Sequence, residues 1–397
     1  MDLLLRFGVI GLGRAATSML PSLAAHPHVR LVAAADPRPE ARARFAAQFQ
    51  ADAYPDAEAL VRRPDVDAVY IATPHQCHAE HVLLAAAHGK HAICEKPMAL
   101  TLDDCARMNA AVERAGVKLV IGHTHSFDPP ILRMREIIRS GEMGRLGMIS
   151  AWNYTDFLYR PRRPEELDAS LGGGIIFNQV PHQVDSVRLL GGGLVRSVRA
   201  MAGTWDPARP VPGAAAVFLD FADGAAATIT YSGYDHFRAN EFCEWVGEGG
   251  QPASPDRHGE ARRALRSVGP GDEAGLKAST GFGGARQRHV GGPGAPPHHP
   301  HFGVVIASCE RGDLRPSPRG VLVYADDGRR ELPVPLGRAA PDKGKVVDEL
   351  YAAVRDDRPP LHDGRWGSAT LEVCLAIVES SRTRREVLLA HQVPARG

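Results

Sequence analysis

The chain has 397 residues, more than a single hydrophobic core usually supports, so we expect two domains. Its 47 lysines and arginines balance 46 aspartates and glutamates, which argues against a nucleic-acid partner and favours a small-molecule substrate. The six cysteines show no CxxC pairing, which predicts a reducing, cytoplasmic location. No stretch predicts a targeting segment or the run of about 18 apolar residues that a membrane span requires.

The N-terminal region predicts a dinucleotide site. A buried strand over 6–10 runs into Gly11-Leu12-Gly13-Arg14-Ala15-Ala16, which has the GxGxxA pattern, and a helix should follow over 15–25. The glycines allow a tight turn and a close approach of the backbone to a pyrophosphate, which would bind at the helix N-terminus. The alternative is a glycine turn with a purely structural role.

A second apolar strand, over 29–35, ends at Asp36, about where the ribose-binding acid of such a unit belongs. Asp36 can accept hydrogen bonds from both ribose hydroxyls and would repel the 2′-phosphate of NADP, so NAD is the preferred cofactor. NADP remains the alternative cofactor because the guanidinium of Arg14 or Arg38 could bind its phosphate, although either group could instead stack on the adenine.

The alternation of strands and helices continues and predicts an α/β Rossmann domain over 1–124 with a doubly wound parallel sheet. We expect helices over 39–49, 55–62, 78–88 and 102–115, and strands over 67–72, 92–95 and 118–121. Ligands of such sheets bind at the carboxyl ends of the strands, so Gly11, Asp36, Thr73 and Lys96 should share one crevice.

The stretch Ala92-Ile93-Cys94-Glu95-Lys96-Pro97 places a lysine at the end of a short apolar run. Partial burial at the mouth of a sheet favours the neutral amine, and this lowers the pKa of a lysine toward the range useful for proton transfer. Pro97 lacks a backbone donor and should end the strand. The alternative is a solvated lysine in a strand-to-helix turn.

The second half, 125–397, predicts an α+β domain with an open, mainly antiparallel sheet. Strands expected over 147–155, 195–202, 214–221, 225–232 and 241–247 have no helices between them. Residues 249–299 are rich in Gly, Pro and charge and read as a flexible insertion. Further strands are expected over 321–324 and 330–333, and helices over 130–140, 344–355 and 367–381, the last a candidate to pack back on the first domain.

A second stretch with candidate catalytic residues runs from Gly172 to Asp185, and its apolar residues recur with a helical period from about Asn178. Asn178, His182 and Asp185 then fall at i, i+4 and i+7, on one face. His182 is a candidate general acid or base that Asp185 could orient, and the alternative is a buried histidine that Asp185 satisfies. The other histidines lack a clear set of ligands, so we expect no metal site.

Together these motifs resemble the family of glucose-fructose oxidoreductase, inositol dehydrogenase and rhizopine-catabolism oxidoreductases (Gfo/Idh/MocA). The matching pieces are Gly11-Leu12-Gly13, Ala72-Thr73-Pro74 with His78, Glu95-Lys96-Pro97, residues 172–185 and the closing segment 371–386. The resemblance implies hydride transfer at a secondary alcohol or carbonyl carbon, with Lys96 and His182 handling the proton. It assigns Thr73, Pro74, His78 and Glu95 to the cofactor site, and it implies a homodimer or homotetramer formed through the C-terminal sheet.

The sequence departs from this family at two places. Asn178 stands where many members have Asp, and an amide cannot relay a proton, so Lys96 and His182 would have to share the task. Ser126 stands where many members have Arg, so the pocket near His123 and Phe127 is not expected to be a standard sugar pocket.

Within the family, residues 178–185, 299–303 and 308–316 resemble the phthalate 4,5-cis-dihydrodiol dehydrogenase branch. That branch implies oxidation of a ring carbinol to 4,5-dihydroxyphthalate. Arg160, Arg162 and Arg163 are then candidates for the substrate carboxylates, and the alternative is a solvated basic loop. The competing functions are a sugar or cyclitol dehydrogenase, a dinucleotide-binding regulator without catalysis, and redox-neutral hydrolysis with tightly held NAD.

Overall fold

The computed structural model describes residues 3–122, 125–269, 272–287, 297–336 and 343–396. The chain forms two compact units. The first consists of Met1–Gly122, Ala274–Ala295 and Arg338–Ser368, and the second of His123–Glu273, Pro296–Gly337 and Ala369–Gly397. The chain therefore passes between the units near residue 122, and two later segments return to the first unit. In the described residues, no helix combines the length and the apolar character that crossing a membrane requires.

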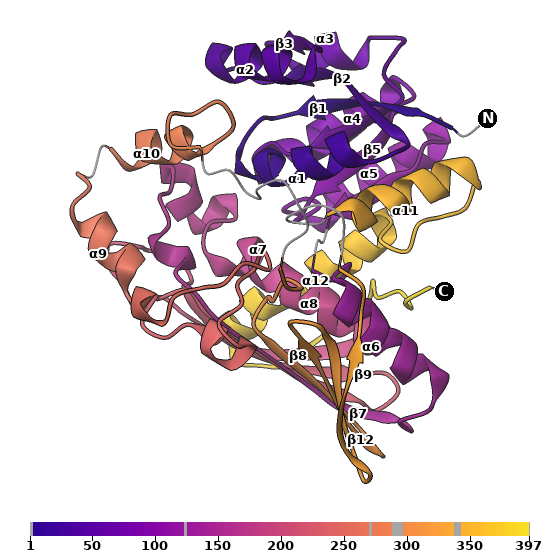
Figure 1. The fold of residues 1–397 in the computed structure, drawn as a ribbon, viewed down its shortest axis with the longest axis vertical. Helices are drawn as coiled ribbons and strands as arrows, with labels where there is room; N and C mark the ends of the chain where they lie inside the picture. The colour runs from indigo at the N-terminus through magenta and orange to yellow at the C-terminus, as the bar shows by residue number, and fades with distance from the viewer. Residues whose placement is uncertain (1–2, 123–124, 270–271, 288–296, 337–342, 397) are drawn as a thin grey trace. The chain divides into compact units, whose positions relative to one another are not determined.

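The first unit contains a six-stranded parallel sheet with the order β3-β2-β1-β4-β5-β6, which confirms the predicted Rossmann fold (Figure 1). Its strands are β1 (Leu5–Ile10), β2 (Val29–Ala35), β3 (Asp52–Tyr54), β4 (Ala68–Ile71), β5 (His91–Glu95) and β6 (Leu119–Gly122). The intervening helices are α1 (Arg14–Ala25), α2 (Pro39–Phe49), α3 (Ala57–Val61), α4 (His78–Ala87) and α5 (Leu102–Ala115). The strand order reverses between β1 and β4, so the ligand crevice should lie at the carboxyl ends of these two strands.

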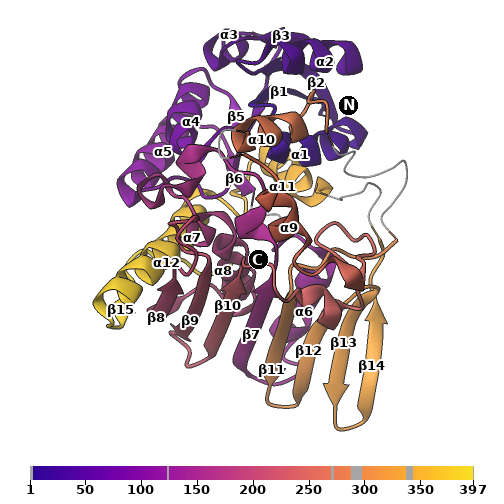
Figure 2. The same cartoon turned by 90° about the vertical axis from the view of Figure 1, so that its left-hand side faces the viewer.

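The second unit is built on a nine-stranded sheet with the order β14-β13-β12-β11-β7-β10-β9-β8-β15 (Figure 2). Among the described strands of this sheet, only β7 and β10 pair in parallel, which confirms a mainly antiparallel sheet. The strands are β7 (Leu146–Tyr154), β8 (Val195–Gly203), β9 (Ala214–Phe221), β10 (Ala226–Ser232), β11 (Val304–Cys309), β12 (Gly312–Ser317), β13 (Gly320–Ala325), β14 (Gly328–Pro333) and β15 (Val387–Leu388).

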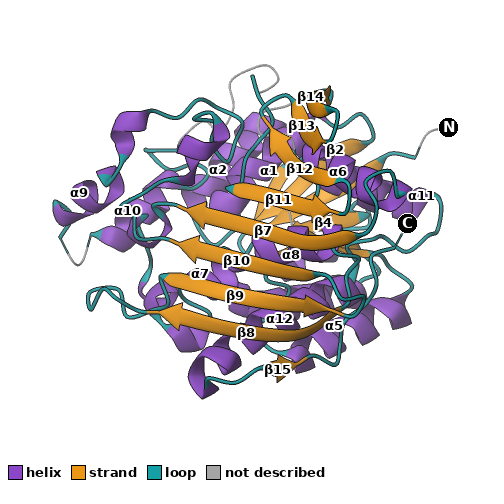
Figure 3. Ribbon diagram, turned by 90° about the horizontal axis from the view of Figure 1, so that it is seen from below, coloured by secondary structure: helices purple, strands orange, loops and turns teal. Residues whose placement is uncertain are grey.

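The two faces of this sheet differ in character. Helices α6 (Pro129–Ser140) and α8 (Val180–Leu190) pack on one face, where side chains such as Ile149 and Ile229 are fully buried. The other face points toward the viewer in Figure 3, and no described helix lies in front of it. Strands β7 and β9, which lie on either side of β10, present Trp152 and Phe218 there, 40% and 47% exposed. This alternation of buried and exposed side chains follows from the two-residue period of strands.

Two sequence-based expectations for the second half differ from the structure. The predicted strand over 241–247 is wrong, because a 3₁₀ helix spans Ala239–Cys243 and the backbone then turns through positive φ angles at Glu244 and Trp245. The stretch predicted as a flexible insertion contains α9 (Glu260–Arg266) and α10 (Glu273–Thr280). Ala261 and Leu265 of α9 pack against the buried cluster around Tyr159, so this helix has an apolar contact face.

Two helices near the C-terminus follow the predicted pattern of apolar residues. Helix α11 (Gly344–Arg355) buries Val346, Val347 and Leu350. Helix α12 (Gly364–Thr383) is divided between the units, because residues up to Ser368 cluster with the first and residues from Ala369 with the second. The prediction that this helix packs back on the first domain concerns the relation of the units and stays a prediction.

The second unit buries a histidine in its core. His301 is 5% exposed, and burial, with a smaller effect of the nearby Arg315 charge, lowers its pKa to about 4. In the unfolded chain a histidine titrates near its ordinary value of about 6.5. The unfolded state therefore binds this proton first as the pH falls.

We expect the free energy of unfolding of the second unit to fall by about 1 kcal/mol between pH 7.5 and 5.5 on account of His301. The full loss, about 3 kcal/mol, is reached as the pH falls through about 4, the folded-state pKa. Urea unfolding of His301→Gln should show a smaller pH dependence than the native protein. His391→Gln, which changes an exposed histidine of the same unit, is the control. Equal pH dependence in native protein and His301→Gln would contradict this account.

Candidate active site

The glycine loop after β1 lies against the end of β4. Gly11 has a φ of +89°, and a Cβ at this position would lie 2.9 Å from the carbonyl oxygen of Ala72. A side chain would therefore clash with backbone as well as strain the turn. Glycine at this position therefore allows the loop to approach the carboxyl end of β4 this closely.

Helix α1 begins directly after this loop, at Arg14. Its N-cap residue is Gly13, which supplies no side-chain capping bond, and its first turn contains no acidic residue. A Cβ at Gly13 would have only the Ala72 carbonyl oxygen near it, at 3.9 Å, so the space above the loop is open. Amide groups of a helix N-terminus bind phosphate well, so Gly11, Leu12, Gly13, Arg14 and Ala15 fit the pyrophosphate of a dinucleotide.

Asp36 connects this loop to the end of β2. Its carboxylate accepts from the backbone N–H of Leu12 at 2.7 Å and from the backbone N–H and Nε of Arg38 at 2.9 and 3.0 Å. The Arg38 guanidinium also donates to the Leu12 carbonyl oxygen at 2.7 Å. Asp36 is 5% exposed. A ribose would thus meet a carboxylate that is fixed before the cofactor binds.

The turn that contains Lys96 is braced from β4. The Tyr70 hydroxyl donates to Glu95 at 2.6 Å in the core of the unit. Burial, together with the charge of Glu95, raises the pKa of Tyr70, so the hydroxyl keeps its proton. Lys96 is half-buried and follows β5 directly. The peptide bond between Lys96 and Pro97 is cis.

His78 was expected to contact the cofactor, but the structure favours a positioning role. The side chain is fully buried, with Nδ1 2.8 Å from the Pro97 carbonyl oxygen and Nε2 3.0 Å from the Thr73 carbonyl oxygen. Burial lowers the pKa of His78, so the ring is neutral and can donate its single N–H to one of these two oxygens. The ring thereby ties the turn after β4 to the turn after β5, which carries Lys96.

In the second unit, the predicted continuous helix from Asn178 is wrong. Helix α7 (Ile175–Asn178) ends at Asn178 and α8 starts at Val180, with Gln179 at φ −122° between them. Pro181 explains the break, because it has no N–H to donate to the preceding turn and its ring would clash there. Asn178 donates instead to the carbonyl oxygens of Gly172 and Gly174 at 3.0 and 2.7 Å, so it holds the glycine-rich loop.

His182 lies in the first turn of α8 within an aromatic cluster. It is 8% exposed, and its ring centroid is 4.9 Å from that of His125 and 5.0 Å from that of Phe302. His125 stacks on Phe302 at 4.4 Å, and its Nδ1 lies 2.9 Å from the carboxylate of Asp128. The sequence analysis did not assign His125 or Asp128 to the site. Their spacing of three residues was the available signal, since it allows a carboxylate to orient a ring.

Asp185 was expected to orient His182, but a second charge lies on the same helix. Asp185 and Arg188 are both fully buried. Burial lowers the pKa of Arg188 to about 10, and the Asp185 carboxylate opposes this shift. Arg188 also donates to Thr370 at 2.8 Å and to Gln392 at 3.0 Å. Asp185 therefore balances a buried cation, which favours a structural role for it.

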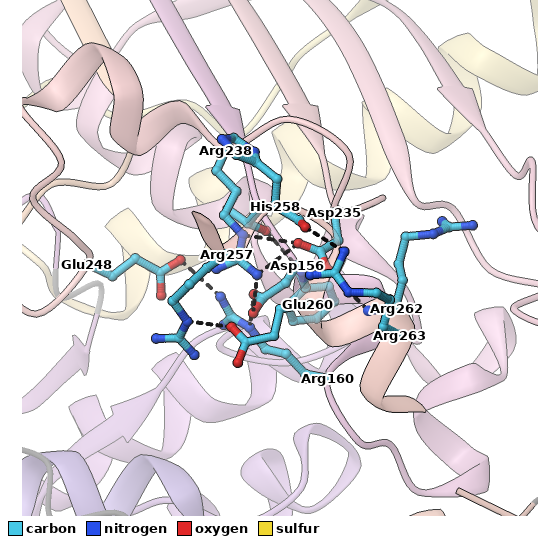
Figure 4. Close-up of polar contacts among 12 residues, drawn as sticks. Asp156, Arg160, Asp235, Arg238, Glu248, Arg257, His258, Glu260, Arg262 and Arg263 are labelled. Carbon is cyan, nitrogen blue, oxygen red and sulfur yellow. Dashed lines mark hydrogen bonds and ion pairs between the residues drawn. The ribbon is translucent and has the colours of Figure 1, made fainter. Parts of the chain in front are cut away.

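Arg160 belongs to a network of ion pairs (Figure 4). It donates to Asp156 at 2.7 Å and lies 3.2 Å from Glu248. Burial opposes its charge, but the Glu248 and Asp156 carboxylates outweigh this effect and raise the pKa of Arg160. Arg238 joins the network through Asp156 at 3.4 Å and Asp235 at 2.8 Å. The charge of Arg160 is thus matched within the protein, which does not favour binding of a substrate carboxylate.

The other two arginines of the same loop also have carboxylate partners within the protein. Arg162 places its guanidinium carbon 3.7 Å from the ring centroid of Phe157 and lies 3.5 Å from Glu166. Arg163 pairs with Glu165 at 2.9 Å. Each arginine of the loop therefore has a carboxylate partner within the protein, and a role for the loop in binding substrate carboxylates stays a prediction.

The remaining predicted positions have less defined surroundings. Phe127 is 5% exposed and lies in the second unit. His123 lies outside the described residues. Thr73 places its hydroxyl 3.0 Å from Nδ1 of His81, and Pro74 directly precedes the short helix before α4. Within the part of the chain that the structure describes, no group of three or more His, Cys, Asp or Glu side chains is arranged to hold a metal ion.

Comparison with known proteins identifies the family. Residues 5–123 match the oxidoreductase family with an NAD-binding Rossmann fold, and residues 131–251 match the GFO/IDH/MocA C-terminal domain. The chain is 44% identical over 382 residues to a 1-carboxy-3-chloro-3,4-dihydroxycyclohexa-1,5-diene dehydrogenase of Comamonas testosteroni, which covers 95% of each chain.

Solved structures agree with this assignment. A crystal structure from Bordetella bronchiseptica RB50, of a protein assigned as a dehydrogenase, is 47% identical, has a TM-score of 0.92, and covers 98% of this chain and 100% of its own. An oxidoreductase from Agrobacterium radiobacter in complex with NAD+, L-tartaric acid and magnesium shares the fold, with a TM-score of 0.72, 20% identity and coverage of 97% and 98%. The chain therefore belongs to the Gfo/Idh/MocA family and is an NAD(P)-dependent oxidoreductase whose first unit is the NAD-binding Rossmann domain.

Proposed function

We propose that this enzyme oxidises a carboxylated cyclic cis-dihydrodiol with NAD. The observation that carries the proposal is the 44% identity, over 95% of both chains, to a dehydrogenase of a carboxylated dihydroxycyclohexadiene. Phthalate cis-4,5-dihydrodiol, which the sequence motifs suggested, is one substrate of this class. NAD, when bound, accepts the hydride from the carbinol carbon of such a ring.

The first unit supplies the residues that hold the cofactor and move the first proton. The loop at Gly11 and Gly13 and the N-terminus of α1 would bind the pyrophosphate, and Asp36 would accept from the ribose hydroxyls. Lys96 hydrogen-bonds the reacting hydroxyl and accepts its proton as the carbinol becomes a carbonyl. Because His78 holds the Pro97 carbonyl oxygen, at 2.8 Å, the lysine turn is fixed before substrate binds.

The second unit supplies His182, which we propose to handle the proton that moves when the ring ketone tautomerises to the aromatic catechol. Aromatisation makes the overall oxidation favourable. His125 is the positioning residue for His182, since its ring packs against His182 at 4.9 Å and its Nδ1 is held by Asp128. This arrangement lets the Asp128 carboxylate favour one tautomer of His125 without touching substrate.

The substrate class and Lys96 can be tested together by following absorbance of reduced nicotinamide with NAD. We expect turnover with phthalate cis-4,5-dihydrodiol or with 1-carboxy-3-chloro-3,4-dihydroxycyclohexa-1,5-diene, and none with inositols or aldoses. Lys96→Met should lower turnover about a thousandfold, because a methionine cannot accept the proton. Lys118→Met, which removes a half-buried lysine paired with Asp357 and remote in sequence from the lysine turn, is the matched control. Turnover of polyols alone would replace this proposal with a cyclitol or sugar dehydrogenase.

Cofactor choice can be tested without any substrate. Asp36→Ala removes the acceptor of the ribose hydroxyls and leaves the Arg38 guanidinium and the Leu12 N–H to face a 2′-phosphate. We expect the ratio of the Kd values for NADH and NADPH to shift roughly tenfold toward NADPH, since hydrogen bonds to charged groups contribute about 1.5–3 kcal/mol. Fluorescence titration measures both constants, with Asp65→Ala as control. An unchanged ratio would remove Asp36 from the ribose site.

We propose that the enzyme is a homodimer or homotetramer formed through the outer face of the nine-stranded sheet. Strands β7, β9 and β8 present Met148, Trp152, Phe218 and Met201 there, each 40–47% exposed, and such an apolar surface usually marks an interface. Phe218→Glu should give a smaller mass by light scattering, whereas Leu171→Glu, off the sheet, should not. A native protein that is monomeric in solution would contradict the proposal.

A further inference from the structure

We infer that residues 274–287, which we call the docking segment, form part of the binding site for the adenosine half of the cofactor. The sequence pattern predicted a flexible insertion here. In the structure the segment belongs to the first unit, although the chain on both sides of it belongs partly to the second. The segment packs against α2, the helix that follows Asp36 and Arg38.

The anchor of the docking segment is Phe282, which is 2% exposed. Its ring packs against two rings of α2, at centroid distances of 6.4 Å from Phe45 and 6.3 Å from Phe49. Phe282 and Gln287 also line a hollow together with Thr17 of α1. The segment therefore contacts α2 and borders a hollow that α1 also lines, next to β2, the strand that leads to Asp36.

The backbone next to the anchor approaches α2 more closely than a side chain would allow. Gly283 has a φ of +78°, and a Cβ there would lie 3.0 Å from the Cα of Ala41 and 3.2 Å from the carbonyl oxygen of Glu40. The loop is closed internally, because the N–H of Gly283 donates to Gln287 at 2.8 Å and the N–H of Arg286 donates to the Ser279 carbonyl oxygen at 2.8 Å.

This loop reaches the residue that holds Asp36. A Cβ at Gly281 would lie 3.4 Å from Nη1 of Arg38, so the glycine backbone passes beside the guanidinium. Arg38 in turn contacts both Asp36 and the glycine loop through Leu12. In a Rossmann domain these groups surround the adenosine ribose. The docking segment thus limits the positions that Arg38 can adopt, and Phe282 is a positioning residue for the cofactor.

The test compares ligands that represent the two halves of the dinucleotide. Phe282→Ala should raise the Kd of NADH, measured by fluorescence, and of AMP, measured by its competition with NADH, each by about tenfold. The Kd of nicotinamide mononucleotide should stay within about twofold of the native value, which a general loss of folding would not allow. Phe242→Ala, which truncates a phenylalanine 51% exposed in the second unit, is the matched control and should bind all three ligands as the native protein does.

A second variant keeps the test decisive if Phe282→Ala does not fold. Gly283→Ala retains the anchor but places a Cβ against Ala41, so it should also raise the Kd of AMP. Unchanged Kd values of NADH and AMP in either folded variant would overturn the inference. So would a rise in the Kd of nicotinamide mononucleotide as large as the rise in the Kd of AMP. Failure of the native protein to bind NADH would instead contradict the cofactor assignment on which the inference rests.

Discussion

The hydrogen bonds of the Asp36 carboxylate are the interaction on which the cofactor half of the protein depends. One oxygen holds the glycine loop through the N–H of Leu12, and the other holds Arg38 at the start of α2. Three pieces of chain that come from different parts of one βαβ unit are thereby fixed around a single charge. A buried carboxylate is stable only when such donors surround it, so the same bonds stabilise the fold and prepare the ribose site.

The turn that contains Lys96 is also held in place by buried side chains, but these side chains are neutral. A turn after a strand has no ladder partner of its own, and its backbone groups must find other ones. His78 lies 2.8 Å from the Pro97 carbonyl oxygen of this turn, and Tyr70 donates to the side chain of Glu95 just before it. Both stay neutral because burial moves their pKa values away from the charged form. Lys96 thus sits on a rigid base, and rigidity at the reacting group is what lowers the entropic part of a barrier.

Local sequence pattern was enough for much of this architecture. The predicted strand over 29–35 and helix over 344–355 match β2 and α11, because apolar spacing and end signals lie within those segments. The second partner of Arg160 could not be predicted, since Glu248 lies 88 positions away and nothing in either neighbourhood specifies the pairing. The break before α8 could have been predicted, because Pro181 stands where a continuous helix needs a donor.

The docking segment shows why composition misled the sequence analysis. Its glycines were interpreted as a sign of flexibility, and glycine is indeed common in disordered segments. Here three of them, Gly281, Gly283 and Gly284, lie where a Cβ would approach a neighbouring group within 3.4 Å. Glycine at such positions permits close packing, and the buried Phe282 among them supplies the apolar area that holds the loop in place. A glycine-rich stretch that contains one large aromatic residue is therefore better read as a docking loop than as a linker.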